Sequence, residues 1–209
     1  MAIEDNDMKK VKKGTYGYIK YQKKKTFLIT FILFLIPLVI YATGYIQTKT
    51  RLNLLTVVAI LGCLPACKSL VGLIMIMMQK PVPQPVYEEL KAANKDLTAG
   101  YELVFTAYEH TTPVNALIIC GDQLVCYTPD QKTDAAYLEK HISKIMTING
   151  FASVQVKVMK DIKKYVQRVS EIYNRQEHYR EGIEFTPDEQ YPDLSREELI
   201  FHTLLAISL

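Results

Sequence analysis

The 209-residue sequence has no tryptophan, and no acidic residue lies between positions 26 and 80. Glycine and proline number only nine each, which excludes collagen-like and low-complexity chains. The chain also lacks the short motifs that bind nucleotides or catalytic zinc, namely G-x-x-x-x-G-K-[ST], G-x-G-x-x-G, H-E-x-x-H and a paired C-x-x-C. No particular reaction, cofactor or metal is therefore indicated, and this length favours one compact domain with accessory segments.

The net charge of +3 hides a strong asymmetry along the chain. Residues 1–25 carry eight lysines against three acids, whereas residues 81–209 carry 13 basic and 19 acidic side chains. Nucleic-acid binding requires a basic face that neutralises phosphates, and the second region has a net charge of −6. We therefore expect no nucleic-acid partner.

Two long apolar runs hold much of the hydrophobic content. Phe27 to Ile46 is 20 residues without a charge, and Leu54 to Met78 is 25 residues with a single charge, Lys68. Twenty helical residues extend about 30 Å, which is the thickness of the hydrocarbon core of a bilayer. The runs predict a transmembrane hairpin over 26–80, with spans at about 27–46 and 54–78. A buried helix of a soluble protein is the alternative for each run; a cleaved signal peptide is rejected because the first run is too long.

Positive charge near the ends of the spans predicts their orientation. Nine lysines flank the end of the hairpin from which both termini emerge, whereas the loop at its other end carries only Lys49 and Arg51. This bias predicts a multi-pass protein of the cell (inner) membrane with both termini in the cytoplasm. We expect the basic tail, residues 1–25, to contact anionic lipid headgroups, at about 1 kcal/mol per lysine. Its lysines are Lys9, Lys10, Lys12, Lys13, Lys20, Lys23, Lys24 and Lys25.

Lys68 and Pro65 interrupt the second apolar run. A charged side chain inside a bilayer normally has a partner or a route to water, and neither span contains an acid to pair with it. Three interpretations remain open. Lys68 pairs with an acidic group of another subunit or protein, it lines a polar pathway, or the helix breaks at Pro65 and Lys68 reaches the interface.

After a proline-rich spacer at 81–86, residues 87–209 are expected to form a small cytoplasmic α/β (α+β) domain with a mixed sheet of about four strands covered by helices. Gly100 is expected to stop the first helix, and Thr111–Pro113 to form a turn. Capping residues predict helix starts at Asp134, Asp161 and Ser195. We expect helices at about 87–97 and 134–148, from 162, and from 195, and strands at 101–108, 114–120, 123–128 and 152–159.

Gly121-Asp122 is a two-residue hairpin signal between two apolar strands. Such a turn pairs Cys120 with Gln123 and puts Cys126 opposite Leu117, on the other face of the sheet. The two cysteines are therefore expected not to form a disulfide, in agreement with a reducing cytoplasm.

Candidate catalytic residues are few. His110 beside Glu109 is an acid–base pair near a predicted strand end, and Cys120 is a thiol at the tip of a strand without a neighbouring base in the sequence. The four histidines are scattered, so no metal site is predicted.

The order helix-strand-strand-strand-helix-strand over about residues 87–159 is similar to the core of the restriction-endonuclease-like nucleases. That resemblance implies an acid in the second strand and an acid-x-Lys in the third, which together hold Mg²⁺. The third strand here, QLVCYT, has neither, and Asp122 in the turn is the nearest acid. On this pattern an inactive relative is favoured over an active nuclease.

The sequence thus predicts a two-span membrane protein that acts by binding, as an anchor, adaptor or assembly subunit. Its expected partners are anionic lipids and either another protein or a second copy. The alternatives are a membrane-tethered enzyme acting on a cytoplasmic or lipid-linked substrate, and a small transport subunit built around Lys68.

Overall fold

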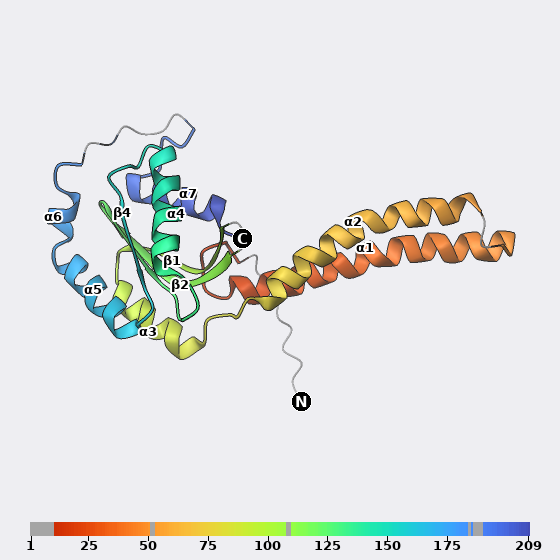
Figure 1. Cartoon of the computed structure of the whole chain (residues 1–209), viewed down its shortest axis with the longest axis horizontal. Coiled ribbons are helices and arrows are strands. Elements are labelled where there is room, and N and C mark those ends of the chain that lie inside the picture. The colour runs from red at the N-terminus through yellow and green to blue at the C-terminus, as the bar shows by residue number, and fades with distance from the viewer. Residues whose placement is uncertain (1–10, 51–52, 108–109, 184, 186–189) are drawn as a thin grey trace. The chain divides into compact units, whose positions relative to one another are not determined.

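The structure is a computed structural model that describes residues 11–50, 53–107, 110–183, 185 and 190–209 (Figure 1). The described residues form two compact units. The first is a helical hairpin, Ile19–Lys80. The second, here called the domain, combines Val11–Tyr18 with Pro81–Leu209. A short segment that precedes the hairpin therefore folds with the residues that follow it.

The hairpin consists of α1 (Tyr18–Thr48) and α2 (Leu54–Met78), and both helices are long and apolar enough to cross a membrane. Small side chains bring the two helices together: a Cβ on Gly44 would lie 2.7 Å from Leu55 Cβ, and one on Gly62 would lie 3.4 Å from Pro37 Cβ. α2 continues without interruption through Pro65, so the structure does not support the one of the three interpretations in which the helix breaks at this residue.

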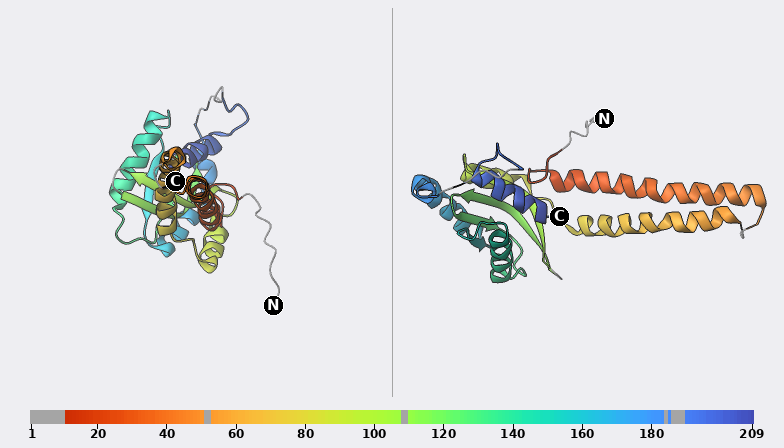
Figure 2. Two further views of the ribbon diagram at one scale, coloured as in Figure 1. Left: turned by 90° about the vertical axis from the view of Figure 1, so that its right-hand side faces the viewer. Right: turned by 90° about the horizontal axis from the view of Figure 1, so that it is seen from above.

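The domain contains a four-stranded sheet in the order β1-β2-β3-β4, with helices on both faces (Figures 1 and 2). β1 pairs with β2 and β2 with β3 in antiparallel fashion, whereas β3 pairs with β4 in parallel. This confirms the predicted mixed sheet. The strands are β1 (Thr98–Ala107), β2 (His110–Cys120), β3 (Gln123–Tyr127) and β4 (Gln155–Met159). The helices are α3 (Gln84–Asn94), α4 (Ala135–Ile148), α5 (Ile162–Asn174), α6 (Gln176–Arg180) and α7 (Arg196–Ile207).

Each face of the sheet has its own apolar core. Leu138 and Ile142 of α4 and Ile200 of α7 pack on one face, around Leu117 and Cys126. The other face is covered by α3 and α5, which pack around Cys120. The two strand cysteines therefore lie on opposite faces, as the sequence predicts.

The predicted register of the β2–β3 hairpin is confirmed residue by residue, with Cys120 opposite Gln123 and Leu117 opposite Cys126. The predicted caps are also confirmed. The side chains of Asp134 and Asp161 accept hydrogen bonds from the first turns of α4 and α5, and Ser195 forms a capping box at the start of α7.

Two local predictions are wrong. Gly100 does not stop a helix but lies within β1, where a Cβ would approach Phe201 of α7 to 2.4 Å. Thr111–Pro113 do not form a turn but belong to β2. Pro113 is tolerated there because its partner Val104 directs its carbonyl outward, to the N–H of Leu209, so this pair needs no ladder hydrogen bond from residue 113.

Candidate functional site

A half-buried polar cluster surrounds the carboxylate of Glu197, in the first turn of α7. Its Oε1 accepts hydrogen bonds from the backbone N–H of Gly121 at 2.9 Å and from Nε of Arg180 at 2.8 Å. Its Oε2 accepts from Nη2 of Arg180 at 3.0 Å and from the Thr98 hydroxyl at 3.2 Å. Burial raises the pKa of Glu197, but these donors outweigh burial and hold the pKa below its ordinary value. The cluster therefore joins β1, the β2–β3 turn, α6 and α7 through one ionised carboxylate.

A second arginine holds the same turn from another side. Arg196 forms an ion pair with Asp122 and donates to the carbonyl oxygen of Gly121 at 2.8 Å. It also donates to the hydroxyl of Ser153 at 3.0 Å, and this hydroxyl in turn donates to Asp122 at 2.8 Å. Both arginines are thus paired with carboxylates.

Gly121 allows α6 to approach the turn. Its φ is +55°, and a Cβ built on it would lie 1.8 Å from the carbonyl oxygen of Tyr179. A residue with a side chain would meet both a strained backbone conformation and a backbone atom that cannot rotate away.

A cavity of about 360 Å³ opens beside this cluster. Ile183 and Phe185 contribute apolar surface, and Arg180, Arg196 and Glu197 contribute polar groups. Each of these arginines has a carboxylate partner, so the described residues that line the cavity present no unpaired arginine to select an anion.

The structure does not bring the predicted catalytic residues together. His110 and Cys120 are the two ends of β2, which separates them by about 30 Å at the usual rise per residue. Cys120 is fully buried, and burial raises the pKa of its thiol, so it is not an activated nucleophile. Glu109 lies outside the described residues. Within the described part of the chain, no three potential metal ligands form a group.

The N-terminal segment, Val11–Tyr18, packs on the domain through backbone and side-chain contacts. The N–H of Tyr101 in β1 donates to the carbonyl oxygen of Gly14 at 2.8 Å. The Tyr16 ring stacks on Tyr87 of α3, with centroids 4.0 Å apart and an interplanar angle of 11°. Lys13 donates to the carbonyl of Ser208, and burial lowers its pKa. The part of the predicted basic tail from Val11 to Tyr18 is therefore a folded component of the domain.

A buried amide continues these contacts into the core. The Asn94 side chain donates to the hydroxyl of Tyr101 at 3.1 Å and accepts from the hydroxyl of Tyr165 at 3.0 Å. Tyr165 and Asn94 are almost completely buried. Neither side chain was singled out by the sequence, because both sit at ordinary core positions of predicted helices.

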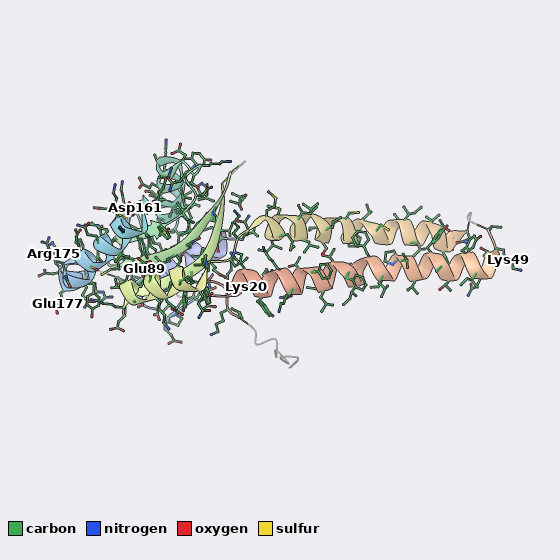
Figure 3. The ribbon with its side chains drawn as sticks, turned by 90° about the horizontal axis from the view of Figure 1, so that it is seen from below. Lys20, Lys49, Glu89, Asp161, Arg175 and Glu177 are labelled. Atoms are coloured by element: carbon green, nitrogen blue, oxygen red, sulfur yellow. The ribbon has the colours of Figure 1, made fainter. Side chains whose placement is uncertain are left out.

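The predicted lipid-contact lysines have different environments. Lys9 and Lys10 lie outside the described residues. Lys23 donates to the carbonyl oxygen of Met77 at 3.1 Å, and so connects the two helices. The exposed members of the set are Lys12, Lys20, Lys24 and Lys25. Figure 3 shows Lys20 near the start of α1 and Lys49 beyond its far end.

Lys68 is exposed on α2, and among the described residues no carboxylate forms an ion pair with it. The side of α2 that contacts α1 is marked instead by Ala66 and Ser69, whose hydroxyl lies 2.7 Å from that of Thr30. Pro65 is exposed within the same helix. The described hairpin therefore offers no polar pathway between its two helices at Lys68.

The comparisons with known proteins add no relative: no protein-family model, curated protein or solved structure matches this chain.

Proposed function

We propose that this chain is a two-span membrane protein whose cytoplasmic domain acts by binding, as an anchor, adaptor or assembly subunit. One observation carries the proposal. Among the described residues, all large hydrophobic side chains that are exposed lie on α1 and α2, except Tyr137, Ile148 and Tyr191. Only 17% and 11% of the most apolar stretches of the two helices are buried, whereas a core helix of a soluble protein is mostly buried. A bilayer is the environment that such a surface suits.

The N-terminal segment supports a topology with both ends on one side. Residues 11–18 and 81–209 belong to the same folded unit, yet they precede and follow the hairpin. This arrangement supports a topology in which both ends of the hairpin emerge into the same compartment. The excess of lysine at this end favours the cytoplasm of a cell with an inner membrane.

The contacts made by the polar groups of the domain support the proposed binding role. The charged groups of the Glu197 cluster are paired with one another, and both domain cysteines are buried in apolar cores. Exposed Lys20, Lys24 and Lys25, in the first turns of α1, are available to anionic headgroups at about 1 kcal/mol each.

A membrane-tethered enzyme is the second candidate, and the cavity beside Glu197 is the observation that favours it. The order α3-β1-β2-β3-α4-β4 is the one compared above with the nuclease core. However, neither β2 nor β3 contains an acid, so a metal-dependent nuclease is not proposed.

Labelling with a membrane-impermeant maleimide tests the topology. Thr50→Cys in the hairpin loop is expected to react in intact cells, whereas Glu177→Cys on α6 reacts only in inside-out vesicles. The parent chain is the control, because Cys120 and Cys126 are buried in the domain and, in the proposed topology, Cys63 and Cys67 lie within the second span, out of reach of a membrane-impermeant reagent. Extraction of the protein by alkaline carbonate, or labelling of both positions from one side, contradicts the two-span proposal.

The mass of the full chain, extracted in a mild detergent, separates binding from catalysis. A stable complex with a defined protein partner supports the adaptor role. A monomer that retains a bound small molecule supports the enzyme instead.

A further inference from the structure

Lys68 and Gly72 share a face of α2 that does not contact α1. They are four residues apart, so their side chains project from the same side of the helix. Lys68 is exposed, and a Cβ built on Gly72 would have no atom within 4 Å. We call the surface formed by these two residues the Lys68 face.

The contact between Thr30 and Ser69 sets the depth of Lys68 within the hairpin. Because the helices are antiparallel, Lys68 is level with about Phe31, four residues into the apolar run that starts at Phe27. Its Cα is thus about 6 Å inside that boundary at the helical rise. Side chains on a helix lean toward its N-terminus, which for α2 is the hairpin loop. The Cα–Cβ bond of Lys68 therefore points toward the hairpin loop and away from the lysines of α1.

Neither this hairpin nor a second copy of it can neutralise Lys68, because no acid lies between residues 26 and 80. A second copy on the same face would bring a like charge into contact. An ionisable residue inside a bilayer normally pairs with a group of opposite charge or a backbone carbonyl, or has a route to water, and among these partners only a carboxylate neutralises the lysine charge. The occupant that satisfies it is a carboxylate supplied by a different chain.

We propose that the Lys68 face docks one membrane-spanning helix of another protein, which carries Asp or Glu at the depth of Lys68. This inference rests on the proposed two-span topology. The ammonium donates up to three hydrogen bonds to the carboxylate, and Gly72, one turn away, allows the backbones to approach closely. The expected partner helix therefore has one acidic residue at this depth and small side chains around it.

Photo-crosslinking in vesicles of zwitterionic lipid tests the proposal. The probes are three synthetic Leu/Ala transmembrane peptides with a diazirine group, which differ only in bearing Asp, Asn or Leu at the depth of Lys68. We expect the Asp peptide to crosslink about tenfold more than the Leu peptide, the range of polar contacts between membrane helices. Lys68→Met removes this preference, and Lys68→Arg retains it. Lys80→Met, which removes an exposed lysine just beyond the end of α2, is the matched control and retains the preference.

Equal crosslinking of the Asp and Leu peptides overturns the proposal, as does a Lys68→Met chain that still prefers Asp. Dimers of the chain that form without peptide and vanish in Lys68→Met would assign the face to a second copy instead, and also overturn it. Flotation and protease protection of the same vesicles report insertion. A chain that fails to insert refutes the two-span proposal, whereas an inserted chain without the Asp preference refutes only the docking of an acidic helix.

Discussion

Removal of the Glu197 carboxylate is expected to destabilise the domain by about 2–3 kcal/mol. The Arg180 side chain is 44% exposed, so its ion pair contributes about 0.5–1 kcal/mol after solvent screening. The hydrogen bonds from the Gly121 N–H and the Thr98 hydroxyl add about 1 kcal/mol each, because their acceptor is charged and half-buried. For a domain of this size, the total lowers the melting temperature by about 6–12 °C.

The effect depends on pH in a defined direction. The folded-state pKa of Glu197 lies below its ordinary value of 4.5, so at pH values between the folded-state and unfolded-state pKa the unfolded state binds more protons. The stabilisation is therefore complete above the unfolded-state pKa and is lost as the pH falls through the lowered folded-state pKa. The difference in melting temperature between the parent and Glu197→Gln is expected to narrow at pH values below the lowered folded-state pKa.

Thermal unfolding of the full chain in detergent, followed by near-ultraviolet circular dichroism of tyrosine, measures both effects. Glu171→Ala is the matched control, because its pair with Arg168 is an exposed i,i+3 contact at 3.3 Å and contributes less than about 0.5 kcal/mol. If Glu197→Ala melts at the same temperature as Glu171→Ala, the Glu197 cluster does not hold α6 and α7 to the sheet and the reasoning is refuted.

Three further predictions follow from single residues. Gly121→Ala is expected to lower the melting temperature more than Glu197→Ala, because the new methyl group collides with the last turn of α6; an unchanged melting curve would contradict this packing. Tyr165→Phe is expected to cost about 1–2 kcal/mol by leaving the Asn94 oxygen without its donor, and denaturant unfolding measures the loss. Burial raises the pKa of Cys120, and that of Cys126 to about 12, so neither is alkylated by iodoacetamide at pH 8 until the domain unfolds. Mass spectrometric mapping of the alkylated cysteines tests this prediction, and rapid alkylation of either thiol in the folded protein would disprove its burial.

Turn and capping signals that span only a few residues of the sequence predicted much of this fold. The two-residue turn at Gly121-Asp122 defined the register of β2 and β3, because strand side chains alternate with period two. The caps at Asp134 and Asp161 depend on atoms within one helical turn. The hairpin register and the helix caps were therefore predicted with the correct residues, whereas the turn expected at Thr111–Pro113 was not.

Errors arose where a distant segment decides the conformation. Gly100 reads as a helix stop in isolation, but it provides the space that Phe201 of α7 occupies against β1. From the sequence, Glu197 was expected only to lie in the first turn of the helix that starts at the Ser195 cap. Its partners Thr98, Gly121 and Arg180 lie 99, 76 and 17 residues away in the sequence, and no local sequence pattern predicts such contacts.

The N-terminal segment supports the proposed topology with an argument that does not depend on counting lysines. Gly14 has a φ of +82° and lies against Phe201 and Leu205 of α7, near the other end of the chain. The first described residues and the last therefore belong to one compact unit, although the apolar hairpin separates them in sequence. If the hairpin crosses a membrane, the domain is complete only when both spans are inserted and both flanks share a compartment. The domain then folds completely only if the hairpin has the correct topology, because an inverted first span would remove Gly14 and Tyr16 from their contacts with α7 and α3.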